Sequence, residues 1–169
     1  TRCSDMAFTE LNSVENFIIH QLSGVNLNTG SERVLENNKN EPPRWQYCSA
    51  QELNRSVNEV LLEEHLKESL QKLNPEIAAV PERADEVLHK LRSIIISVAQ
   101  TGLVRANEEF LAWCNGEKTM PFGENNAHVP VKIFDFENIH NNQYVITNQF
   151  RVHLRETKIP DVVLFINGI

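Results

Sequence analysis

The chain has 169 residues, of which 41% are hydrophobic and 23% are charged, a composition typical of a folded globular domain rather than a disordered segment. Its 16 basic and 23 acidic residues give a formal charge of −7, which excludes a general basic coat for nucleic acid but not a local basic face. The longest apolar runs, residues 94–96 and 162–166, are far shorter than the roughly 20 residues of a membrane-spanning helix, so we expect no membrane partner.

The cysteines and the chain ends bear on location and completeness. Cys3, Cys48 and Cys114 are odd in number and widely spaced, which favours a reduced, cytoplasmic protein over a disulfide scaffold or a zinc site. The N-terminus lacks the basic and apolar segments of a secretory signal. Because the chain begins at Thr1 and ends at Ile169 within a strong strand signal, we expect it to be an excised piece of a larger protein.

A helical period dominates residues 12–115. Asn12 or Ser13 is expected to cap the first helix, and Gly24 to end it. Residues 26–48 are expected to form a loop or insertion, in which residues 45–47 pack back on the core.

Three further helices follow this loop. A capping box at 56–59 predicts the start of the second helix, which ends at 74–75. The third runs from the proline at 81 to the glycine at 102, and the fourth ends at 115–116. Their apolar stripes are interpreted as core; they include Leu62, Leu66, Leu70, Leu73, Val87, Leu88, Leu91, Ile94, Ile95, Val98, Phe110, Leu111 and Trp113.

After residue 121 the hydrophobic period changes to two, which predicts strands over 129–166. Residues 129–134 and 143–155 alternate and are expected to pair as an antiparallel hairpin. Residues 162–166 are apolar throughout, which favours a central strand covered on both faces. Asn167 and Gly168 then predict a type I′ turn into a returning strand. The fold class is therefore α+β, with residues 1–169 as the N-terminal part of a single domain.

One acidic residue and one basic strand face are the candidates for chemistry. Asp161 lies at the mouth of the last strand, where it is placed to hold a divalent cation with a carboxylate of the returning strand. From the Pro160–Asp161 dipeptide alone, the favoured alternative is that Asp161 caps the turn after Pro160. Arg151, His153 and Arg155 share one face of the expected strand, which suits either contacts with DNA phosphates or, as the favoured alternative, a plain solvated surface.

The stretch 159–168 (IPDVVLFING) closely resembles the nuclease motif in the R (restriction and motor) subunit of type I restriction–modification enzymes, the HsdR family. Segments 10–15, 66–75, 102–107 and 148–152 resemble the same N-terminal region in the same order. The resemblance implies a restriction-endonuclease-like PD-(D/E)xK core, with N-terminal helices packed on a mixed or antiparallel sheet. It also implies that the chain stops within the sheet, before the (D/E)-x-Lys half of the motif.

The same resemblance implies a function and its residues. Asp161 matches the metal-binding aspartate, and Glu15 resembles the helix carboxylate of such sites, with Glu10 or a merely exposed Glu15 as alternatives. If Glu15 belongs to the site, its carboxyl group should lie within about 10 Å of that of Asp161. Arg151 and Arg155 are the candidate DNA contacts.

The parent would be a type I site-specific deoxyribonuclease that cleaves double-stranded DNA with Mg²⁺ after ATP-driven translocation by other domains. Its partners would be the methylation and specificity subunits. Without the second carboxylate and the lysine, the chain alone is expected to be inactive. The alternative is a noncatalytic docking module that keeps the nuclease fold.

Overall fold

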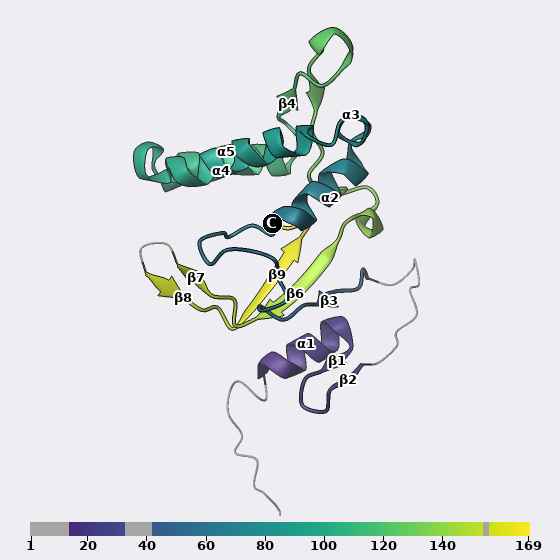
Figure 1. Ribbon diagram of the computed structural model, residues 1–169, viewed down its shortest axis with the longest axis vertical. Helices are drawn as coiled ribbons and strands as arrows, with labels where there is room; N and C mark the ends of the chain where they lie inside the picture. Colours follow the sequence, from purple (N-terminus) through teal and green to yellow (C-terminus); the bar gives the residue numbers. More distant parts are fainter. Residues whose placement is uncertain (1–13, 33–41, 154–155) are drawn as a thin grey trace, which may run out of the picture. The chain divides into compact units, whose positions relative to one another are not determined.

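The computed structural model describes residues 14–32, 42–153 and 156–169, and every structural statement below concerns these residues. They fall into two compact units (Figure 1). Unit 1 comprises the described residues up to 60 together with 144–165, and unit 2 comprises 61–143 and 166–169. Helices and small sheets occur together, so the expected α+β class is confirmed.

A mixed three-stranded sheet forms the centre of unit 1. Strand β3 (Gln46–Tyr47) pairs in parallel with β6 (Tyr144–Asn148), and β9 (Val162–Ile166) lies on the other side of β6. Figure 1 shows β6 and β9 running in opposite directions. Helix α1 (Asn16–Ser23) packs on β6 and β3 and buries Ile19 completely. A mixed sheet carrying an N-terminal helix is what the sequence predicts.

Two short hairpins complete unit 1. Strands β1 (Val25–Asn26) and β2 (Ser31–Glu32) pair antiparallel, as do β7 (Val152–His153) and β8 (Thr157–Lys158). The region 26–48 therefore contains regular structure as well as loop. The segment 45–47 does pack back on the core, because the Trp45 ring contacts the Tyr144 ring edge-on at a centroid distance of 5.2 Å.

The structure corrects the expected strand over 143–155. Strand β6 ends at Asn148, because Gln149 adopts a left-handed conformation with φ of 51°. The expected alternation is also wrong, since Val145, Ile146 and Thr147 are all buried. The reason is that β6, rather than β9, is the central strand, flanked by β3 and β9.

Strand β9 was expected to be central and covered on both faces, and this is wrong. Among the described residues, β9 lies at the edge of the sheet beside β6. Phe165 is buried, whereas Leu164 is 47% exposed. An apolar run therefore marks this strand correctly but does not reveal its place in the sheet.

Unit 2 is built on helices α2 (Glu63–Leu73), α3 (Pro75–Ala79), α4 (Arg83–Thr101) and α5 (Leu103–Cys114). Helix α2 packs on α3 and α4, and α4 packs on α5. Most of the expected core is confirmed, but Leu111 is 58% exposed, and Leu73, Ile95, Val98 and Phe110 are only half-buried. None of the helices in the described ranges combines the length and apolar character needed to cross a membrane.

Of the expected capping box only the Glu59 carboxylate bond forms, because the Glu59 N–H donates to the Ser56 backbone carbonyl instead of the hydroxyl, and the box does not begin α2. The Ser56 N–H donates to the Glu59 carboxylate at 2.8 Å within an isolated turn, and the helix starts later, at Glu63. Leu62 precedes the helix with non-helical backbone angles, and its N–H donates to the carbonyl of Gly168 at 2.9 Å. The N–H of Leu62, the residue before α2, is thus paired with the turn at 167–168 rather than with a carbonyl of the preceding turn.

The expected hairpin between 129–134 and 143–155 is also wrong. Strand β5 (Val129–Pro130) instead pairs antiparallel with β4 (Thr119–Met120), across a turn that contains the short helix η2 (Glu124–Asn126). Closing this short loop costs less conformational entropy than a longer one. A second short helix, η3 (Ile139–Asn141), precedes β6.

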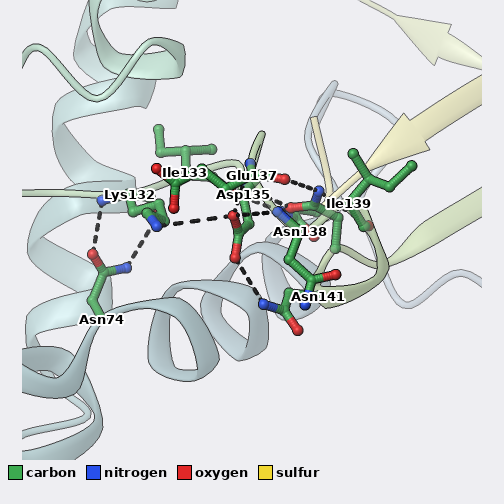
Figure 2. Close-up of polar contacts among 10 residues, drawn as sticks. Asn74, Lys132, Ile133, Asp135, Glu137, Asn138, Ile139 and Asn141 are labelled. Atoms are coloured by element: carbon green, nitrogen blue, oxygen red, sulfur yellow. Dashed lines mark hydrogen bonds and ion pairs between the residues drawn. The ribbon is translucent and has the colours of Figure 1, made fainter. Parts of the chain in front are cut away.

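Side-chain hydrogen bonds hold the segment that follows β5 in unit 2 (Figure 2). The Asn74 amide bonds both backbone groups of Lys132, at 2.7 and 2.8 Å. The Asp135 carboxylate accepts bonds from the Asn138 N–H and the Asn141 side chain, which lower its pKa, the Asn138 bond most. Because the folded pKa is the lower one, the stability from this carboxylate is complete above the ordinary value of 3.8 and is lost as the pH falls through the folded pKa.

The type I′ turn predicted after β9 is confirmed. Asn167 and Gly168 have φ of 53° and 84°, and Ile166 and Ile169 exchange both backbone hydrogen bonds, at 2.9 and 3.0 Å.

Asn167 has a further role that the turn signal did not indicate. Its side chain is completely buried. The Asn167 Oδ1 accepts the Gln143 N–H at 2.7 Å, and its Nδ2 donates to the Ile133 carbonyl, also at 2.7 Å. The turn is thereby fixed to the segment between β5 and β6.

Replacement of Gly168 tests this packing. A Cβ at Gly168 would lie 2.4 Å from the Leu62 carbonyl oxygen and 2.7 Å from the Leu66 nitrogen. We predict that Gly168→Ala lowers the free energy of urea unfolding by about 2–4 kcal/mol, through left-handed strain together with overpacking. Gly30→Ala is the matched control, because Gly30 has φ of 66° but no atom within 4 Å. Equal losses in the two variants would contradict the steric argument.

Candidate functional site

Glu15 supplies a buried carboxylate at the start of helix α1. It occupies the N-cap position and is only 7% exposed. Its carboxylate oxygens accept long hydrogen bonds from the Gln149 side-chain amide, at 3.3 and 3.5 Å. The alternative that Glu15 is merely an exposed helix residue is therefore wrong. Glu10, the other candidate, lies outside the described residues.

Gln149 connects Glu15 to the segment that leads into β9. It ends β6 in a left-handed conformation, which is uncommon for a residue with a long side chain. Its backbone N–H donates to the Asp161 carbonyl at 3.1 Å, and the N–H of Phe150 donates to the Pro160 carbonyl at 3.2 Å. Gln149 thus contacts Glu15 through its side chain and Asp161 through its backbone.

Asp161 is exposed and directly precedes β9. Its carboxylate makes no hydrogen bond or ion pair with any residue that the structure describes, so the capping of a turn is not observed. This oxygen pair is therefore available to a ligand. The expected separation of about 10 Å between the carboxyl groups of Glu15 and Asp161 stays a prediction.

The donor atoms of this pair suit a hard divalent cation. Mg²⁺ prefers oxygen ligands and usually keeps several waters beside one or two carboxylates. Glu15 is buried next to a neutral amide and Asp161 is unpartnered, so both carboxylates fit such an ion. Within the described ranges no three His, Cys, Asp or Glu side chains are grouped closely enough to form a metal site by themselves.

The basic residues near this pair differ from expectation. Arg151 is exposed and lies outside β7, which begins at Val152, so Arg151 is not part of the expected strand face. Arg155 lies outside the described residues. Arg55, which the sequence analysis missed, has its guanidinium carbon 3.5 Å from the centre of the Phe150 ring and donates to the Arg151 carbonyl.

No local sequence signal reveals the roles of Gln149 or Arg55. The alternation around Gln149 predicts a continuous strand, and the position of Arg55 before a capping box predicts an exposed polar residue. Cys48 and Cys114 are free thiols. Cys3 lies outside the described residues.

Comparisons with known proteins identify the family. The chain belongs to the family described as type I restriction enzyme R protein N terminus, which matches residues 8–169. It is 29% identical over 117 residues to the type I restriction enzyme HindI endonuclease subunit of Haemophilus influenzae, covering 65% of this chain and 10% of that protein. It is 42% identical over 59 residues to the putative type I restriction enzyme MjaIXP endonuclease subunit of Methanocaldococcus jannaschii, covering 32% of this chain and 5% of that protein.

The chain therefore spans a tenth or less of the length of these curated relatives. No solved structure matches it significantly. The expected family is confirmed, whereas the PD-(D/E)xK fold itself stays a proposal.

The backbone conformation at Gln149 generates a stability prediction. Gln149→Gly and Gln149→Ala both remove the amide that contacts Glu15, but only glycine adopts φ of 51° without steric cost. We predict that the glycine variant is the more stable by about 1 kcal/mol in urea unfolding. An alanine variant as stable as the glycine variant would show that this backbone is not held left-handed in solution.

Proposed function

We propose that this chain supplies the metal-binding part of an endonuclease domain that cleaves double-stranded DNA in the R subunit of a type I restriction enzyme. Asp161 and Glu15 are the proposed metal ligands. The contact of Gln149 with both residues carries the proposal, because it connects a helix carboxylate to the aspartate before β9. Membership of the family and the names of the two relatives support it.

The edge position of β9 supports the same proposal. The turn at 167–168 reverses the chain direction, so any residues that follow Ile169 in the parent subunit would run antiparallel to β9. A carboxylate and a lysine spaced as (D/E)-x-Lys on that strand would come close to Asp161, since cross-strand neighbours lie about 5 Å apart. These residues would complete the site.

The residues present have distinct tasks in phosphodiester hydrolysis. When bound, Mg²⁺ would stabilise charge on the phosphate oxygens and provide an acidic water. Asp161 offers a free, solvent-accessible carboxylate to bind the ion. Glu15 offers a buried carboxylate whose orientation is restrained by Gln149, so less side-chain freedom is lost when it acts as a ligand.

The remaining parts of the reaction belong to the parent complex. We propose that ATP-driven translocation takes place in other domains of the R subunit, and that the methylation and specificity subunits are its partners. The chain alone, without the second carboxylate and the lysine, is predicted not to cleave DNA.

A noncatalytic docking module is the second candidate. One observation favours it: apolar side chains are exposed where α4 meets α5, with Ile96, Leu103 and Val104 between 63% and 76% exposed. Such side chains suit a contact with another protein surface. In this case Asp161 and Glu15 would have no role in cleavage.

Two substitutions in the intact R subunit separate these candidates. We predict that Asp161→Ala and Glu15→Gln each reduce plasmid cleavage by the reconstituted complex by about 100-fold or more, because each removes a group that stabilises the transition state through the metal. ATP hydrolysis, measured on the same samples, should be unchanged. Glu108→Gln, which alters an exposed carboxylate on α5, is the matched control and should cleave normally.

Cleavage at the control rate by both variants would contradict the nuclease proposal and favour the docking module. Loss of cleavage together with loss of ATP hydrolysis would instead indicate a folding defect, which circular dichroism and thermal unfolding of each variant would detect.

A further inference from the structure

A polar cavity of about 470 Å³ lies within unit 1, next to the candidate metal ligands. It is lined by the turn 49–51 after β3, by Arg55 and Val57, and by the segment 148–149 with Arg151. Among the residues that the structure describes, the two arginines are the charged ones that line it, although the chain as a whole carries a charge of −7. The cavity is thus a local positive site on an acidic protein.

Arg55 is held rigidly at this cavity. Its Nη1 donates to the carbonyls of Ser56 and Glu59, its Nη2 donates to the Arg151 carbonyl, and its guanidinium lies over the Phe150 ring. These partners are neutral, and Arg55 forms no ion pair within 4 Å among the described residues. Its charge is therefore fixed in position and is only partly offset, at longer range, by the Glu59 carboxylate.

One Arg55 donor, the Nε, is buried and has no hydrogen-bond partner in the part of the chain that the structure describes. Burial lowers the pKa of the guanidinium, an effect that the Glu59 carboxylate opposes, but an arginine remains charged throughout the physiological range. Arg151 adds a second cation, and its side chain is exposed and free of ion pairs with described residues.

The cavity adjoins the candidate metal site through a shared residue. Gln149 lines the cavity and also contacts Glu15 and Asp161. An anion bound by the two arginines would therefore lie beside the phosphate group being cleaved. Successive phosphates along a DNA strand would suit this arrangement, since the exposed Arg151 guanidinium can bind phosphate oxygens through paired N–H donors and Arg55 adds a fixed positive charge beside it.

We propose that the Arg55–Arg151 cavity binds a backbone phosphate of the DNA strand next to the scissile one and so positions the strand on the metal site. The inference rests on the proposed nuclease function. It goes further in assigning a phosphate-binding role to Arg55 and in defining a cavity rather than a basic strand face. Free phosphate presents the same oxygen atoms as the DNA backbone, so the experiment distinguishes binding of DNA from binding of free phosphate.

The test measures binding of a fluorescein-labelled 25-base-pair duplex to the intact R subunit by anisotropy, without ATP or divalent metal and across a salt series. We predict that Arg151→Gln weakens binding by about 5- to 10-fold and lowers the slope of log K against log salt by about 0.9, the loss of one phosphate contact. Arg151→Lys should recover most of the slope. Arg105→Gln is the matched control, an exposed arginine on α5 outside the cavity.

A second arm uses inorganic phosphate as competitor. If the cavity binds the DNA backbone rather than free phosphate, millimolar phosphate should displace the duplex from wild type and from Arg151→Gln to the same extent. The contribution of phosphate to ionic strength is subtracted before the two are compared. Stronger displacement from wild type would assign the cavity to free phosphate and overturn the DNA assignment. Arg55→Lys, which keeps the charge but loses the hydrogen bonds that fix its position, should bind the duplex more weakly than wild type.

The outcomes distinguish this inference from the proposed function. If Arg151→Gln and Arg105→Gln bind DNA equally and Asp161→Ala still abolishes cleavage, the phosphate-binding role of the cavity is contradicted. The proposed nuclease function then stands. Normal cleavage by Asp161→Ala would contradict the proposed nuclease function. It would also contradict the proposal that the cavity positions a strand for cutting.

Discussion

The left-handed backbone at Gln149 is the constraint on which the arrangement of unit 1 depends. A regular strand would carry β6 onward and point its side chains alternately to the two faces of the sheet. The break at Gln149 instead directs its N–H to the Asp161 carbonyl and its side-chain amide to Glu15. One residue thus fixes the segment before β9 and the start of α1 against the same point of the sheet. Strained backbone of this kind is often found where a site must be held in position.

In unit 2, side-chain amides provide much of the order between the helices and the last turn. The side chains of Asn74, Asn142 and Asn167 bond backbone groups of the segment 132–143. Buried amides of this kind must have their partners, because an unpaired polar group in the interior costs about 1–3 kcal/mol. The close approach of Gly168 to Leu62 and Leu66 follows from the same packing. The turn that ends β9 is therefore part of the core of unit 2 as well as a chain reversal.

The parts of the fold that were predictable from sequence are those fixed by local chemistry. Gly24 ends α1, Gly102 ends α4, and Asn167 with Gly168 forms a type I′ turn, because each requires positive φ at a stated position. Leu62, Leu66 and Leu70 are buried, as the 3.6-residue period of their apolar positions predicts.

Features set by distant contacts were not predictable. The parallel pairing of β3 with β6 joins residues about a hundred positions apart, and it makes β6 rather than β9 the central strand. The capping box at Ser56 makes only its carboxylate bond and begins no helix, and the N–H of Leu62 is bonded to the Gly168 carbonyl, which lies far along the chain. Asp161 and Glu15 were identified by resemblance, whereas Gln149 and Arg55 became visible only in the folded chain.

The central claim is that Glu15 and Asp161 share one divalent cation, and iron-directed cleavage of the polypeptide tests it most directly. Fe²⁺ placed in a magnesium site generates hydroxyl radicals with ascorbate and peroxide, which cut the nearby backbone. We expect the intact R subunit to be cut near residues 15 and 161, with the cuts suppressed by excess Mg²⁺ and absent in Asp161→Ala. Cuts near residue 161 without cuts near residue 15, or cuts that persist in Asp161→Ala, would show that the two carboxylates do not hold the same ion.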